Sequence, residues 1–155
     1  MSGKAAIHMT TPLVPVPKLG QHQLSLDSGI VILQVNGALS LEEVELLMDY
    51  IHRCGITEPN LGMLLLANGE FSVTPEARRF VVKNSRTERP PVPVAMIGSR
   101  ALLRAVLMLL LNAIRLSLRM DVPVSFFSTE APARAWLTEQ LVHRTTLLAK
   151  YTSRS

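Results

Sequence analysis

The sequence is poor in the residues that metal sites and disulfide-stapled folds require. Cys54 is the single cysteine, so an internal disulfide is excluded and a secreted, disulfide-rich fold is not indicated. The histidines are scattered: His8 and His22 lie near the start, His143 lies near the end, and His52 is two positions from Cys54, on another helix face. Because a metal site needs three or four converging ligands, we predict no metal and no cofactor.

Motifs for nucleotide binding and catalysis are also missing. Neither a Walker sequence nor a Gly-x-Gly-x-x-Gly turn follows any expected strand. Cys54 falls at the end of an expected helix and is interpreted as a small packing residue, since no base and orienting group accompany it. The acidic residues Glu42, Glu43, Glu45 and Asp49 are interpreted as a solvated helix face. We therefore expect a protein without enzymatic activity.

The basic residues are concentrated in one part of the chain. The formal net charge is +4, and nine of the sixteen Lys and Arg residues lie between Arg78 and Arg119. No aromatic platform interleaves these side chains and no helix-turn-helix pattern appears, so nucleic acid is not an expected partner. The candidate contacts to some other anionic group are Arg78, Arg79, Lys83, Arg100 and Arg104.

The chain divides into three parts by its pattern. Residues 1–20 contain Pro12, Pro15 and Pro17 without a sustained hydrophobic period, and we expect a flexible leader there. This stretch lacks an uninterrupted apolar run of the signal-peptide type, so we expect a cytoplasmic protein. Residues 21–144 are expected to form one α/β domain, and residues 145–155 a short polar tail.

Local signals predict where the elements begin and end. Asp27-Ser28-Gly29 separates two strand-like runs, as in a β-hairpin. Ser40 and Glu43 have the spacing of a capping box, which begins a helix that we expect to end at Gly55. Thr74, followed by Pro75, has the pattern of an N-cap and begins a second helix.

Strands and helices alternate along the rest of the domain. The further expected strands are 63–67, 92–97 and 124–127, and the further expected helices are 100–118 and one that begins after Ser128 or Thr129. Such alternation predicts a mostly parallel central sheet with crossover helices, about four in all, and the opening hairpin adds an antiparallel edge.

Several segments of this layout resemble the STAS superfamily, especially its SpoIIAA-like branch. The segments are Val31 to Gly37, the serine-capped helix, Leu64 to Arg78, Val94 to Gly98, and Phe126 to Glu130 leading to Ala135-Trp136-Leu137. The resemblance covers about four-fifths of the chain and implies a small sheet with packed helices and a regulatory role in protein interaction, as in anti-sigma factor antagonists. That branch is also likened to lipid-binding domains.

The chain departs from the resembled pattern at one place. Phosphorylatable members carry an Asp-Ser-Ser-Gly-like turn after the second core strand, and residues 68–74 lack it. The nearest hydroxyls are Ser72 and Thr74, which are the candidate phosphosites. Thr74 as a plain helix cap is the alternative.

The helix expected over 100–118 is unusually apolar. Residues 105–111 are apolar on all sides, and Met108 interrupts the sector that holds the arginines. The run is too short for a membrane span, since Arg104, Asn112 and Arg115 leave about half the length that a bilayer needs. Its outer arc is open to the chain's own leader or last helix, to a protein partner such as a second copy forming a homodimer, or to a lipid or membrane surface. The predicted interface residues are Leu103, Val106, Leu107, Leu110, Ile114 and Leu118.

Overall fold

A five-stranded sheet forms the centre of the fold. The computed structural model describes residues 14–57, 60–84, 92–98, 101–118 and 122–153. The strands are β1 (Gln23–Asp27), β2 (Ile30–Leu39), β3 (Gly62–Val73), β4 (Val94–Ile97) and β5 (Val124–Phe127). They lie in the order β1-β2-β3-β4-β5, with β1 antiparallel to β2 and every other neighbouring pair parallel. The predicted fold class is confirmed.

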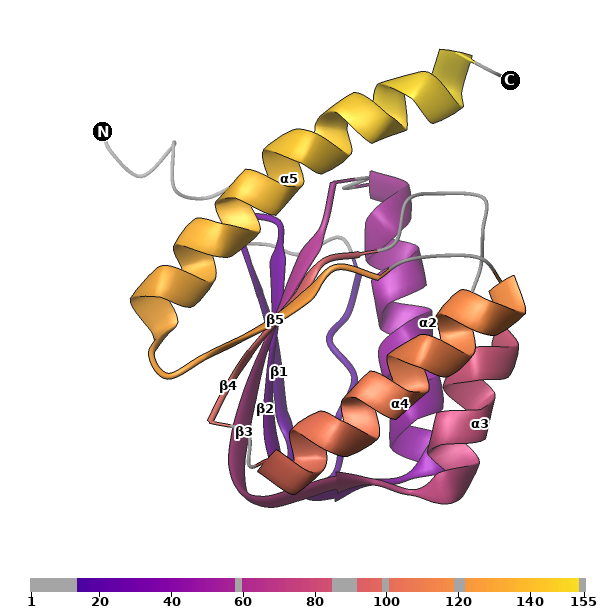
Figure 1. Cartoon of the computed structure of the whole chain (residues 1–155), viewed down its shortest axis with the longest axis vertical. Coiled ribbons are helices and arrows are strands. Elements are labelled where there is room, and N and C mark those ends of the chain that lie inside the picture. The colour runs from indigo at the N-terminus through magenta and orange to yellow at the C-terminus, as the bar shows by residue number, and fades with distance from the viewer. Residues whose placement is uncertain (1–13, 58–59, 85–91, 99–100, 119–121, 154–155) are drawn as a thin grey trace.

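In the described ranges, four helices cover the two faces of this sheet. They are α2 (Leu41–Thr57), α3 (Pro75–Asn84), α4 (Ala101–Leu118) and α5 (Glu130–Ser153). Figure 1 shows α2, α3 and α4 on one face and α5 on the other. The strands are added one after another in the same direction, so crossovers of one hand place their three helices on a single face. The helix α5, which follows the edge strand β5, covers the opposite face.

The helix starts predicted from local signals are confirmed. The amide N–H of Ser40 donates to Glu43 Oε1 at 2.9 Å, and the amide N–H of Glu43 donates to Ser40 Oγ at 3.2 Å. Thr74 Oγ1 accepts from the amide N–H of Ala77 at 3.3 Å, as an N-cap does. The predicted end at Gly55 is wrong, because α2 continues to Thr57. Tertiary packing of a helix face outweighs the weak preference of a single glycine for helix ends.

Two apolar layers hold the helices on the sheet. On one face, side chains of β2, β3 and β4 pack with Val44 and Leu47 of α2, with Ala77 of α3 and with Leu107 of α4. On the other face, Ala133 and Leu137 of α5 pack on Ile30, Leu64 and Ala95, a set that lies in one cluster. Both layers draw on β3, which is buried on both faces over residues 63–65.

The helix α5 packs against Phe127 at the end of β5. The rings of Phe127 and Trp136 lie with centroids 5.9 Å apart and an interplanar angle of 52°. This tilted arrangement is favourable for aromatic pairs. The Phe-ended strand and the Ala-Trp-Leu segment, which carried part of the family resemblance, are thus in direct contact.

Two boundaries of the predicted division differ from the structure. Residues 1–13 of the predicted leader lie outside the described residues, but Leu19 is 1% exposed and belongs to the core. The predicted tail begins at 145, whereas α5 runs without a break to Ser153. Long-range contacts explain this continuation, since Asn60 Nδ2 donates to Leu141 O at 2.9 Å and to Thr145 Oγ1 at 2.8 Å. These bonds tie the helix to the start of β3.

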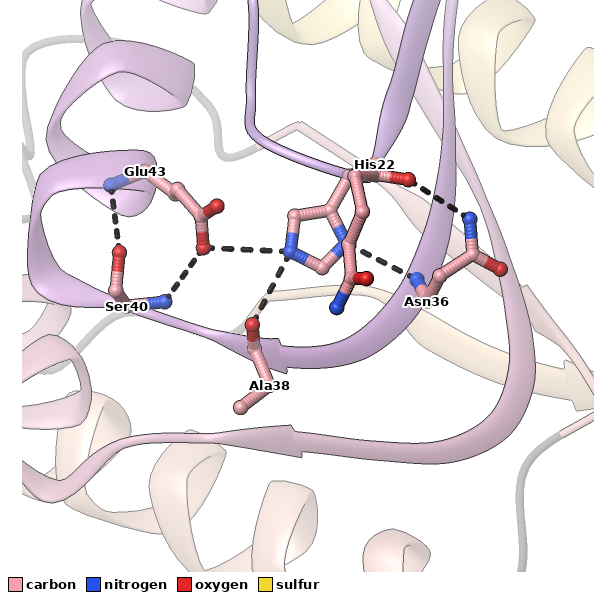
Figure 2. Close-up of polar contacts among 6 residues, drawn as sticks. His22, Asn36, Ala38, Ser40 and Glu43 are labelled. Carbon is pink, nitrogen blue, oxygen red and sulfur yellow. Dashed lines mark hydrogen bonds and ion pairs between the residues drawn. The ribbon is translucent and has the colours of Figure 1, made fainter.

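A buried histidine joins the segment before β1 to the core (Figure 2). The side chain of His22 is 1% exposed, and its Nδ1 accepts from the amide N–H of Asn36 at 3.0 Å. A backbone N–H can only donate, so the ring proton must sit on Nε2. Nε2 lies 3.1 Å from Ala38 O and 3.3 Å from Glu43 Oε1, both acceptors. His22 therefore contacts Glu43 of the α2 capping box, a contact that the sequence pattern did not predict.

The Glu43 carboxylate restricts which residue can occupy position 20. Gly20 has a φ of +61°, in the region that favours glycine, and a β-carbon there would collide with the Glu43 carboxylate. Burial by itself would raise the pKa of Glu43, but the hydrogen bonds from Ser40 and the adjacent His22 outweigh it and hold this pKa below its usual value. Glu43 therefore has a structural role and does not belong to the solvated acidic face predicted for α2.

Candidate functional site

The outer face of α4 is the largest departure from an ordinary protein surface. Met108, Leu109 and Leu116 are 52%, 70% and 74% exposed, and we call these three residues the α4 patch. Single exposed apolar side chains are normal, but three on one helix are not. The exposed positions of α4 fall within an arc of about 140° on an ideal helix. Three of the eight positions described as exposed on that arc hold large apolar side chains.

Two arginines lie on the same arc. Arg104 is exposed and its guanidinium lies over the ring of Phe126, 5.1 Å from the centroid. Arg115 is exposed and donates from Nη2 to Asn112 Oδ1 at 3.0 Å. The helix contains no Asp or Glu, so its exposed face is both apolar and positively charged.

The structure describes the side chain of one of the six predicted interface residues. Leu107, one of the six, is partly buried and packs against the core of the sheet. The side chains of the other five, Leu103, Val106, Leu110, Ile114 and Leu118, lie outside the described residues. Among the described side chains of α4, the exposed leucines are Leu109 and Leu116, which the prediction did not include. The sequence signal for this exposed face was Met108, an apolar residue within the sector of the helix that holds the arginines.

The predicted anionic contacts do not act as one group. Arg78 donates from Nη1 to Val73 O at 2.6 Å and supports the junction between β3 and α3. Arg79 is exposed and lies 4.0 Å from Glu76 of the same helix. Lys83 is exposed in the last turn of α3, and Arg100 lies outside the described residues. Only Arg104 is placed beside the α4 patch.

The predicted phosphosites lie at the junction of β3 and α3. Thr74 is partly buried and its hydroxyl caps α3, as described above. Ser72 is exposed and pairs with Ala38 through the sheet. The capping role of Thr74 accounts for its position without a modification.

The outer face of α2 has the opposite charge to that of α4. Glu42, Glu45 and Asp49 are exposed, and with Leu46, which is 44% exposed, they form what we call the α2 stripe. Asp49 Oδ2 accepts from Arg53 Nε at 3.0 Å, and both side chains are more than half exposed, so the ion pair leaves the stripe accessible. The stripe thus combines carboxylates with one exposed leucine.

The thiol of Cys54 and the phenol of Tyr50, both on α2, are buried. Cys54 is 2% exposed and packs with Tyr50, Val31 and Leu61. Burial raises the pKa of the Cys54 thiol and raises the pKa of Tyr50 to about 12. A thiol that resists deprotonation is a poor nucleophile, as expected for a packing residue.

The described residues hold neither a metal-binding cluster nor a membrane-spanning helix. No three His, Cys, Asp or Glu side chains within the described ranges are close enough together to hold a metal ion. No helix in those ranges is both long enough and apolar enough to cross a membrane.

Comparison with known proteins assigns no family. No family model matches the sequence, and no curated protein is significantly similar to it. The resemblance to the STAS superfamily rests on the sequence segments quoted above and stays a prediction.

Proposed function

We propose that this chain is a non-enzymatic, STAS-like regulatory module of the cytoplasm that works by binding another protein through the exposed face of α4. The observation that carries the proposal is the α4 patch. Leu109 and Leu116 together leave apolar surface whose burial contributes on the order of 3 kcal/mol. A stable domain gains little by exposing so much apolar surface unless a partner covers it.

The position of the patch supports this proposal. It lies on one helix of a three-helix layer, so a partner can reach it without any change in the sheet (Figure 1). Arg104 and Arg115 border the apolar side chains, and charges at the rim of an interface guide the approach and orientation of a partner.

A lipid or membrane surface is the second candidate. Exposed arginines beside apolar side chains are typical of helices that lie in the membrane interface. The acidic α2 stripe belongs to the same helix layer and would be repelled by anionic headgroups, which favours the protein partner.

Site-specific photo-crosslinking in cells tests the proposed function. A photo-crosslinking amino acid replaces Leu109 in one variant and Val142 in a matched control, because Val142 is an apolar residue, 67% exposed, on α5 at the opposite face. We expect adducts of defined protein mass from position 109 and none from position 142. Equal labelling at both positions, or lipid adducts alone at 109, would contradict the proposal.

A further inference from the structure

We propose that the protein bound by the α4 patch is a second copy of this chain, with α4 of each copy against α2 of the other. The inference rests on the proposed role of α4 as an interaction surface and goes further by naming the partner and its docking surface.

The helix layer brings the two complementary surfaces to one face. The helix α3 packs against both α2 and α4, and all three lie on the same side of the sheet (Figure 1). A two-fold axis that runs along α3, between the layers of two copies, places α2 of one copy over α4 of the other. The same contact then forms twice, so the assembly closes as a dimer.

The charges of the described side chains decide which helices meet. Exposed Arg104 and Arg115 carry the charge of α4, whereas Glu42, Glu45 and Asp49 carry the charge of the α2 stripe. Pairing α4 with α4 would place arginines opposite arginines on a helix that has no carboxylate. Pairing α4 with α2 places guanidinium groups opposite carboxylates. Because like charges opposite each other across an interface are strongly selected against, the pairing of α4 with α2 is favoured.

The apolar side chains match as well. Leu46 projects from the acidic stripe with 44% of its surface exposed, and it is the large apolar residue that α2 offers to a partner. The α4 patch supplies Met108, Leu109 and Leu116 opposite it. An apolar centre with a charged rim is the usual arrangement of a protein interface.

The unfavourable part of this arrangement is the repulsion between the α3 helices of the two copies. Exposed Arg79 and Lys83 of α3 would lie near their own copies across the axis, and Glu76, 4.0 Å from Arg79 on the same helix, offsets part of this charge. Exposed charges that keep their solvent are screened at physiological ionic strength, so this repulsion is weak.

Sedimentation velocity on the full-length chain tests the dimer first by removing the apolar contact. We expect wild type to be dimeric at tens of micromolar, Leu109→Glu to be a folded monomer, and Val142→Glu on the opposite face to remain dimeric. Circular dichroism verifies that each variant is folded.

A charge exchange tests the pairing of helices. Arg115→Glu and Glu45→Arg should each weaken the dimer by about tenfold, since each alters both copies of the contact. An equimolar mixture of the two variants, and the double variant alone, should regain wild-type affinity. If Glu45→Arg alone has no effect, or the double variant is not rescued, the pairing of α4 with α2 is refuted.

The two proposals fail in different ways. A monomeric wild type that still gives adducts with another protein at position 109 overturns the second copy and supports the proposed function. A monomer that instead sediments with phosphatidylserine vesicles, and loses that binding in Leu109→Glu, overturns both in favour of a membrane surface. A monomer with neither property overturns both.

Discussion

Replacing His22 by alanine should destabilise the domain more than any change at an exposed histidine. The ring is almost completely buried, and it accepts one hydrogen bond from Asn36 while donating from Nε2 toward Ala38 and Glu43. Its removal leaves a buried N–H without its partner, at a cost of about 1–3 kcal/mol, and opens a cavity beside the core. We therefore expect His22→Ala to lower the free energy of unfolding by about 3 kcal/mol.

The matched control is His52→Ala. His52 is exposed on α2, so its replacement should change the free energy of unfolding by less than about 0.5 kcal/mol. Urea unfolding followed by the fluorescence of Trp136, at one fixed protein concentration, measures both variants. A loss for His22→Ala below about 1 kcal/mol, or equal to that of the control, would refute the role of this network in holding the segment before β1.

Three further predictions concern residues at the starts of α2 and α3. Because the folded state holds the pKa of Glu43 below its ordinary value of 4.5, the unfolded chain takes up a proton first as the pH falls. Wild-type stability should thus decline as the pH drops below that value, and unfolding titrations of Glu43→Gln should show a shallower decline; identical slopes would contradict this. Thr74→Ala should cost about 1 kcal/mol by loss of the cap, while Ser72→Ala, at an exposed site, should not. If Thr74 is also phosphorylated, Thr74→Glu should alter partner binding without loss of the fold, and mass spectrometry of the protein from cells detects the modification.

The elements that the sequence predicted correctly are those encoded by neighbouring residues. Ser40 and Glu43 are three residues apart and bond to each other, so their spacing alone carries the signal. The same holds for Thr74 and the amide of Ala77. The alternation of strands and helices, together with the fixed hand of crossovers, was then enough for a mostly parallel sheet with an antiparallel edge.

The predicted boundaries of the leader and the tail differ from the structure where contacts between distant residues determine them. Leu19 and His22 belong to the core through partners that lie 14 or more residues away, and no local pattern shows such contacts. Likewise, α5 continues past 144 because Asn60, from the start of β3, bonds to its carbonyl and hydroxyl groups. Residues 141–150 mix polar and apolar side chains, and their composition carries no trace of this partner.

Which residues of α4 are exposed also depends on contacts with distant parts of the chain. The residues of this helix are apolar on every side, so hydrophobic periodicity could not distinguish the inward face from the outward one. The placement of the helix against α3 and the sheet turns Leu107 inward and leaves Leu109 and Leu116 in solvent. The amino-acid pattern was sufficient to show that α4 carries more apolar surface than one sheet face can cover. Which side chains form that surplus follows from the position of the helix on its neighbours, because burial is a property of contacts between distant parts of the chain.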